Sequence, residues 1–308
     1  MNPDKQTSIA CQGRAAAASA IFVALQFAAA HSATAQIATL APHLVSQTGP
    51  AAAQAAATGG TPSAAASTLA CTAPAEFVRF ERPLLHTMRR LDSGQPLTIV
   101  AIGSSSTAGA GASSLEASYP SRLAVELRIR FPGREITVLN RGVNGEETDN
   151  MMARFASDVT AAHPQLVLWQ IGTNSVLRDH PLNPHGVRLR QGIEELKNSG
   201  ADVVLIDPQF APAVLAKPEM PGMLEQIALA AKEENVDLFR RFAVMRDWHE
   251  VQHLSFDTFV SPDHLHMNDW SYACVAKLLG MAIAEAATRP LTAAAVRQNG
   301  ASGKPVVP

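Results

Sequence analysis

Residues 97–109 read LTIVAIGSSSTAG, and this stretch decides the fold. Residues 97–102 are nearly all apolar and lack strict polar alternation, which is typical of a strand buried on both faces of a parallel sheet. The glycines and small hydroxyl residues that follow allow a sharp turn. In open α/β sheets, sites lie at the carboxyl ends of the strands, so this turn is the first place to look for function.

Strand-like and helix-like segments alternate through the rest of the chain. Further apolar runs occupy residues 136–139, 166–171, 203–206 and 236–239. Amphipathic stretches occupy residues 120–131, 148–161, 185–199, 220–234 and 269–287. This alternation predicts an α/β protein, a three-layer α/β/α sandwich around a central parallel five-stranded sheet.

The N-terminus has the pattern of an export signal. Lys5 and Arg14 precede the apolar residues 15–30, and Ala33-Thr34-Ala35 supplies a small-x-small cleavage site. The pattern predicts a signal peptide over residues 1–35 and a periplasmic or secreted protein. The alternative is a membrane anchor, but sixteen residues are short for a span of about 20. We therefore expect no stable membrane span after cleavage.

Composition divides the remaining chain into three parts. Residues 36–70 are Ala-rich and uncharged and predict a flexible linker. Residues 71–289 form the expected folded domain, and residues 290–308 a disordered tail. The 308-residue chain is 47% hydrophobic with a net charge of −2, which argues against nucleic acid as a partner. The sequence does not indicate an oligomeric state.

Four polar segments, the first three with glycines, are expected at one rim of the sheet. They are residues 103–109, 140–146, 172–174 and 263–266. Each alone is an ordinary turn or helix start, and the first lacks the lysine of a phosphate-binding loop. Together they contain a hydroxyl nucleophile, a base, a carboxylate and oxyanion donors, which is the set that ester cleavage requires.

These segments resemble the blocks of the SGNH (GDSL-type) hydrolases, a family with a flavodoxin-like sandwich. The resemblance spans about residues 97–285 and implies that Ser105 is the nucleophile and that Asp263 and His266 complete a triad. It also implies an oxyanion hole made by Ser105, Gly145 and Asn174. Such an enzyme needs no metal and no cofactor.

The chain departs from the family pattern at two positions. Ser104 stands where the family has Asp, and Met267 stands where it has Pro. Ser104 and Ser106 remain alternative nucleophiles, and His264 remains an alternative base.

Other polar and aromatic residues have less specific interpretations. Residues 207–210, which include Asp207, follow the fourth strand and are candidates for contact with substrate at the rim. Trp169 is expected in the core. His249 and His253 are expected on a solvated helix face.

The expected activity is hydrolysis of carboxylic esters outside the cytoplasm. The substrate is a small-molecule or polysaccharide ester, and an O-acetyl ester of a carbohydrate fits an exported enzyme best. The alternatives are a lipase or arylesterase acting on small esters, or a non-catalytic carbohydrate-binding relative.

The cysteines predict one disulfide. Cys11 leaves with the signal peptide, so Cys71 and Cys274 remain, an even number in an oxidising compartment. A bridge between them would join the two ends of the domain. The alternative is a buried free Cys274.

Overall fold

The computed structural model describes residues 69–290. The predicted signal peptide, the linker up to residue 68 and the tail from residue 291 lie outside the described residues. Among the helices that are described, none combines the length and the apolar character that crossing a lipid bilayer requires.

All five predicted strands are present and parallel. They are β1 (Leu97–Gly103), β2 (Ile136–Gly142), β3 (Leu166–Gln170), β4 (Asp202–Ile206) and β5 (Asp237–Phe239). Their order in the sheet is β2-β1-β3-β4-β5, the order of flavodoxin-like folds. The predicted fold class is therefore confirmed.

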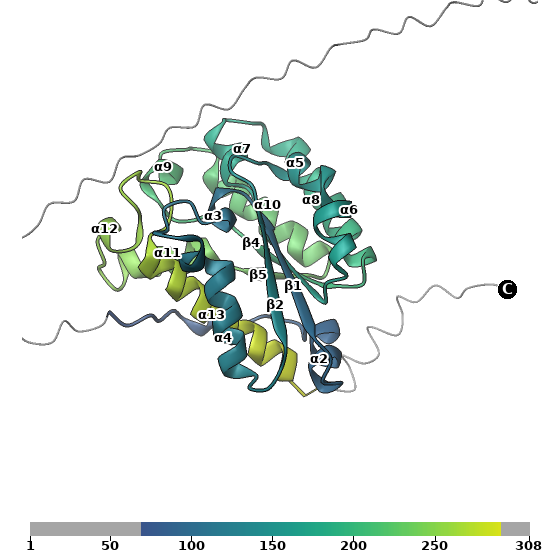
Figure 1. Ribbon diagram of the computed structural model, residues 1–308. Coiled ribbons are helices and arrows are strands. Elements are labelled where there is room, and N and C mark those ends of the chain that lie inside the picture. Colours follow the sequence, from purple (N-terminus) through teal and green to yellow (C-terminus); the bar gives the residue numbers. More distant parts are fainter. Residues whose placement is uncertain (1–68, 291–308) are drawn as a thin grey trace, which may run out of the picture. The chain divides into compact units, whose positions relative to one another are not determined.

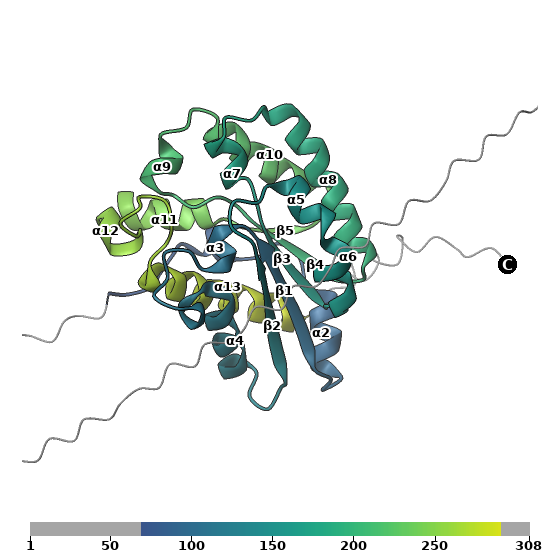
Figure 2. The same cartoon turned by 45° about the horizontal axis from the view of Figure 1, so that its top comes forward.

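Helices cover both faces of this sheet (Figures 1 and 2). One layer contains α2 (Leu85–Asp92), α4 (Tyr119–Arg130) and α13 (Asp269–Thr288). The opposite layer contains α5 (Thr148–Ala153), α8 (Leu182–Asn198) and α10 (Met220–Glu233). The remaining helices are α1 (Ala75–Val78), α3 (Ser105–Ala108), η1 (Leu115–Ala117), α6 (Phe155–Asp158), η2 (Thr160–Ala162), α7 (Thr173–Leu177), α9 (Pro212–Leu215), α11 (Arg241–Glu250) and α12 (Phe256–Phe259).

The sheet interior explains the uninterrupted apolar runs. Every residue of β3 is buried, and β1 is buried except for partly exposed Thr98. Trp169 lies in the core as expected, with its ring edge-on to Phe155 at a centroid distance of 5.1 Å. The edge strand β2 is more exposed, since only its first residue, Ile136, is buried.

Two helical segments differ from the prediction. Residues 148–161 do not form one helix but divide into α5, α6 and η2, with the first break at Arg154. Its side chain reaches the ends of β1 and β2, as described below. Helices α2 and α11 were not predicted from the sequence. Most residues of α11 are buried.

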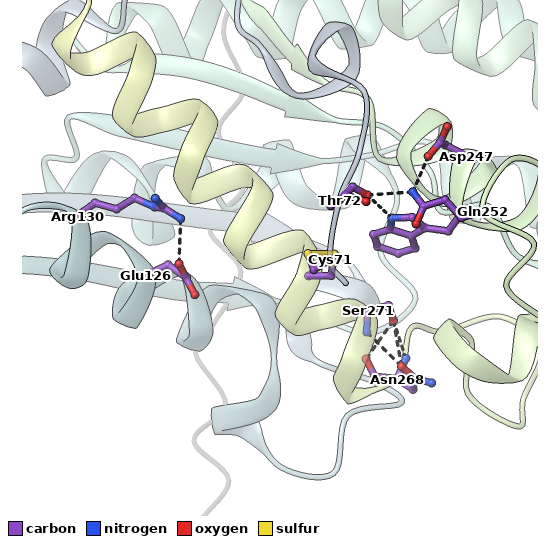
Figure 3. Close-up of a disulfide and its surroundings, with 10 residues drawn as sticks. Cys71, Thr72, Glu126, Arg130, Asp247, Gln252, Asn268 and Ser271 are labelled. Carbon is purple, nitrogen blue, oxygen red and sulfur yellow. Dashed lines mark hydrogen bonds and ion pairs between the residues drawn. A yellow bond between two sulfur atoms is a disulfide. The ribbon is translucent and has the colours of Figure 1, made fainter. Parts of the chain in front are cut away.

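Cys71 and Cys274 form a disulfide in the structure (Figure 3), with Cα atoms 5.4 Å apart. Cys274 is buried in α13. Beside the bridge, the carbonyl of Thr72 accepts hydrogen bonds from Trp248 and Gln252. These contacts attach the first described residues to α11 and α13.

Loss of this bridge is expected to destabilise the domain. The bridge joins residues 203 positions apart, and chain entropy sets its contribution at about 5 kcal/mol or less. Cys71→Ala is therefore expected to lower the melting temperature by on the order of 10 °C. Thermal unfolding with and without reductant measures this shift. Reductant should lower the melting temperature of the wild type but not of Cys71→Ala, and an equal response in both would contradict the prediction.

Candidate active site

The turn after β1 is shaped by glycines that let α3 rest directly on neighbouring backbone. A Cβ atom on Gly142, at the end of β2, would lie 2.1 Å from the backbone nitrogen of Ala108. A Cβ atom on Gly103 would lie 2.2 Å from Oγ1 of Thr107. Side chains at these positions would push α3 away. The glycines therefore place Ser105, the first residue of α3, at the carboxyl edge of the sheet.

Only one of the three adjacent serines has an open hydroxyl. Ser104 and Ser106 are 2% and 1% exposed, whereas Ser105 is half-buried. The hydroxyl of Ser104 donates to Oε1 of Gln170 at 3.1 Å, and its backbone N–H donates to the same oxygen. Ser104 therefore supports the turn through a neutral hydrogen bond.

A continuous chain of polar contacts runs from Ser105 to the last polar segment. Nε2 of His266 lies 2.8 Å from Oγ of Ser105, and Nδ1 of the same ring lies 2.5 Å from Oδ2 of Asp263. The structure thus brings together three residues separated by up to 161 positions. Met267, where the family has Pro, is buried, and Asn268 caps α13 with Ser271.

Hydrogen bonds keep the Asp263 carboxyl ionised. Its Oδ1 accepts from the Ser261 hydroxyl and from the backbone N–H groups of Leu265 and His266. Desolvation alone would raise the pKa of Asp263, but these bonds and the His266 ring outweigh it and hold the pKa well below its usual range. The neighbouring His264 is exposed, and its ring makes no hydrogen bond within residues 69–290.

Hydrogen-bond donors lie on the two segments that follow β2 and β3. Gly145 has φ +78°, a left-handed conformation that favours glycine. Asn174 donates one amide hydrogen to the carbonyl of Glu146 at 2.8 Å, which leaves its second hydrogen free. Among the described residues, the backbone N–H groups of Ser105 and Gly145 have no acceptor.

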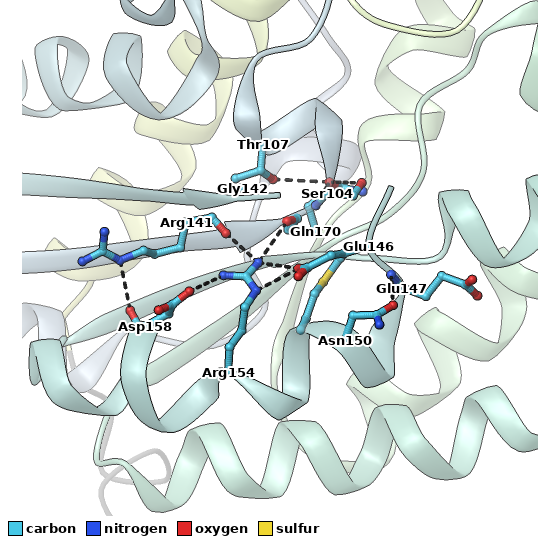
Figure 4. Close-up of polar contacts among 12 residues, drawn as sticks. Ser104, Thr107, Arg141, Gly142, Glu146, Glu147, Asn150, Arg154, Asp158 and Gln170 are labelled. Carbon is cyan, nitrogen blue, oxygen red and sulfur yellow. Dashed lines mark hydrogen bonds and ion pairs between the residues drawn. The ribbon is translucent and has the colours of Figure 1, made fainter. Parts of the chain in front are cut away.

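Arg154 connects these segments from below (Figure 4). Its guanidinium donates to the carbonyls of Gly103 and Arg141 and to the carboxylates of Glu146 and Asp158. One side chain therefore holds the end of β1, the end of β2 and the segment after Gly145. Arg154 could not be recognised from the sequence, because a lone arginine in an amphipathic stretch normally faces solvent.

The prediction that residues 207–210 contact substrate at the rim was wrong. All four are buried, and Asp207 accepts a hydrogen bond from the N–H of Phe242. Burial raises the pKa of Asp207 to about 7, opposed by that hydrogen bond and the charge of Arg241. Gln209 accepts from Thr173 and Arg241 and donates to the carbonyl of Leu265. The segment supports the residue 263–266 turn from within.

The prediction that His249 and His253 lie on a solvated helix face was also wrong, for a different reason at each residue. His249 is half-buried on α11 and stacks on Phe256 at a centroid distance of 4.2 Å. Its Nδ1 contacts the carbonyl of Leu254. His253 is exposed, but it lies in the loop after α11 and not on the helix.

Residues 70–289 match the family described as the Non-GDSL lipase-like family. The chain belongs to this family, and the resemblance to the SGNH hydrolases is thereby confirmed. The description suits the segment Gly103-Ser104-Ser105, in which Ser104 replaces the aspartate of a GDSL motif.

Several known proteins are similar to this chain. An arylesterase of Vibrio mimicus is 34% identical over 98 residues, which are 32% of this chain and 48% of that protein. The match thus spans about half the length of that relative. A solved two-domain esterase active on acetylated mannans has a TM-score of 0.59 and 19% identity, over 75% of this chain and 59% of that chain.

Two further solved structures share the fold. An acetylxylan esterase from Geobacillus stearothermophilus has a TM-score of 0.52 and 21% identity, over 61% of this chain and 94% of that chain. A lipase/acylhydrolase from Enterococcus faecalis has a TM-score of 0.53 and 19% identity, over 61% of this chain and 95% of that chain. At sequence identities this low, the structural similarity shows a shared fold and nothing further.

Replacing Arg154 is expected to destabilise the site. Arg154→Lys keeps the charge but cannot donate to two carbonyls and two carboxylates at once, so we expect a loss of about 2–3 kcal/mol. Urea denaturation measures this loss. Arg141→Ala is the matched control, since the Arg141 side chain makes one long bond of 3.4 Å to the carbonyl of Asp158. Equal losses in the two variants would argue against the role of Arg154.

Proposed function

We propose that this protein is a carboxylic ester hydrolase that uses Ser105 as nucleophile, His266 as general base and Asp263 as the residue that orients the base. The observation that carries the proposal is the contact chain from Ser105 through both ring nitrogens of His266 to Asp263. Membership of a lipase-like family supports it. The free N–H groups beside Ser105 supply the other element that acyl transfer requires.

The first half-reaction forms an acyl-enzyme. Oγ of Ser105 attacks the ester carbonyl carbon while Nε2 of His266 takes the hydroxyl proton. The tetrahedral oxyanion accepts hydrogen bonds from the backbone N–H groups of Ser105 and Gly145 and from the side-chain amide of Asn174. When the intermediate collapses, the bond to the leaving alcohol breaks and His266 returns the proton to that oxygen.

The second half-reaction regenerates the serine. Water attacks the acyl carbon and gives its proton to His266, and the same donors stabilise the second tetrahedral intermediate. Collapse then releases the carboxylic acid and returns the proton to Ser105. The ionised Asp263 carboxylate stabilises the imidazolium in both halves, which its lowered pKa supports.

For the substrate, we propose an O-acetyl ester of a carbohydrate. Three observations support this choice: the export pattern of residues 1–35, the fold shared with an esterase active on acetylated mannans, and the fold shared with an acetylxylan esterase. A second candidate is a small aryl ester, favoured by the local match to an arylesterase. A carbohydrate-binding relative without turnover is the third.

We also propose that the protein is exported and is periplasmic or secreted. The basic residues, apolar run and small-x-small site of residues 1–35 support this. The Cys71–Cys274 disulfide supports it independently, because disulfides persist in oxidising compartments.

Ser105→Ala is expected to abolish hydrolysis of an acetyl ester and labelling by a fluorophosphonate, because only an activated serine attacks either reagent. The expected loss in kcat is about 10⁴-fold or more. Ser106→Ala is the matched control and should keep both signals, since that side chain is buried. Labelling of Ser105→Ala would move the nucleophile elsewhere, and the absence of labelling in the wild type would favour the binding relative.

Acid is expected to lower kcat/KM through protonation of the base. Histidine side chains gain their charge between about pH 5 and 8, and a protonated His266 cannot accept the serine proton. Asp263 stays ionised over this range because its pKa is lowered, so its titration does not contribute. A pH–rate profile measures the effect.

Asp263→Asn tests the same assignment independently of pH. The variant is expected to lower kcat by about 10²–10⁴-fold. A flat profile between pH 5 and 8, or an Asp263→Asn enzyme near the wild-type rate, would contradict the assigned roles.

A further inference from the structure

One buried side chain contacts both of the segments that carry the proposed oxyanion donor and the proposed base. Gln209 follows β4 and is 1% exposed. Its Oε1 accepts a hydrogen bond from the hydroxyl of Thr173 at 3.0 Å, and its Nε2 donates to the carbonyl of Leu265 at 3.2 Å. Thr173 directly precedes the proposed oxyanion donor, Asn174. Leu265 directly precedes the proposed base, His266.

A buried cation fixes the orientation of this amide. Arg241 is fully buried, and it donates to Oε1 of Gln209 at 3.0 Å and to the carbonyl of Asp207 at 2.9 Å. A guanidinium has only donors, and a carbonyl is only an acceptor. If the amide turned over, its NH₂ group would face the guanidinium and its oxygen would face the carbonyl of Leu265. The amide therefore has one satisfied orientation, with its oxygen bonded to the start of α7.

The segment after β4 holds two consecutive carbonyls of the residue 263–266 turn. The backbone N–H of Ala213 donates to the carbonyl of His264 at 3.0 Å, and Gln209 donates to the carbonyl that follows. Hydrogen bonds inside the turn set its local shape, whereas these two bonds attach it to the end of β4. They therefore help to set where the ring of His266 lies along the sheet edge.

Ester cleavage requires the base and the oxyanion donors to keep their places around one carbonyl group. A displacement of about 1 Å in such a group can lower a rate by about 10²-fold. A side chain that is bonded to both segments limits their movement relative to each other. The amide of Gln209 is placed to do this, because its two ends are bonded to the chain neighbours of Asn174 and His266.

We propose that Gln209 is a positioning residue, which acts through Thr173 and Leu265 to keep the oxyanion donor and the base in register. Arg241 supports this role by fixing the orientation of the amide. The inference rests on the proposed esterase function and adds to it a residue that does not touch the reacting atoms. Because the role is one of geometry, its loss should lower kcat and leave KM nearly unchanged.

Gln209→Glu tests the proposal with almost no change in side-chain shape. The new carboxylate can still accept from Thr173 and Arg241, and the adjacent guanidinium keeps it ionised. An ionised carboxylate has no hydrogen to donate to the carbonyl of Leu265. We expect kcat on 4-nitrophenyl acetate to fall by about 10- to 100-fold, with KM near the wild-type value. The rate of fluorophosphonate labelling should fall in parallel.

Gln165→Glu is the matched control. Gln165 lies just before β3, at the opposite edge of the sheet. Its side chain accepts from the backbone N–H of Thr98 at 3.0 Å and donates to the carbonyl of His163 at 2.8 Å. The exchange removes the same kind of donated bond where no residue of the proposed site lies. This variant is expected to keep the wild-type kcat and labelling rate, whatever its effect on the free energy of unfolding in urea.

Thr173→Val provides a second test that keeps the Gln209 side chain. The substitution preserves the branched shape at residue 173 and removes one hydrogen bond to Oε1, so we expect kcat to fall by about threefold to tenfold. Thr173→Ser keeps the hydroxyl and should retain most of the wild-type rate. If Gln209→Glu fails to fold, the difference in kcat between the two Thr173 variants decides the question.

The other outcomes are distinguishable. Wild-type kcat in both Gln209→Glu and Thr173→Val, or a change confined to KM, would overturn the inference and leave the esterase proposal standing. An equal fall in Gln209→Glu and Gln165→Glu would also overturn it, because the loss would then reflect general destabilisation. Absence of ester hydrolysis and of fluorophosphonate labelling in the wild type would instead reject the proposed function itself.

Discussion

The close approach of α3 to the ends of β1 and β2 is the constraint on which the rest of the site depends. It is possible because Gly142 has no side chain where the backbone of Ala108 passes. With α3 in that place, Ser105 lies at the sheet edge and meets His266 from the far end of the chain. A side chain at residue 142 would displace the helix and the serine together, because its Cβ atom would lie 2.1 Å from the backbone nitrogen of Ala108.

Much of the fold could be predicted from the sequence, because a parallel strand that is buried on both faces consists of a short run of apolar residues. The candidate site could be predicted for a related reason, since Ser105, Gly145 and Asn174 lie in short segments directly after strands, while Asp263 and His266 form a short polar motif just before the last helix. The break at Arg154 and the burial of residues 207–210 could not. Both depend on side chains that find partners across the fold, such as Arg154 with Gly103 and Gln209 with Leu265, and local pattern carries no signal for such contacts. Gln170, a polar residue in an apolar strand, was a visible sign that something polar lay against it.

The replacement of aspartate by Ser104 is compensated within the structure by neutral groups. Oε1 of Gln170 receives hydrogen bonds from the backbone and hydroxyl of Ser104 and from the hydroxyl of Thr107. The charged interactions lie beside the turn, where Arg154 pairs with Glu146 and Asp158 and donates to the carbonyl of Gly103. Within the described residues, the turn is thus stabilised by neutral groups, and no carboxylate is among the hydrogen-bond partners of Ser104.

The disulfide closes residues 71–274 into a single covalent ring, and all five strands and every residue assigned to the site lie inside it. A protease that cut one loop between those positions would therefore open the ring without releasing a fragment. Both pieces would remain joined, and the packed sheet would hold the serine, histidine and aspartate in register across the cut. This topology makes a single nick an event that the molecule can survive.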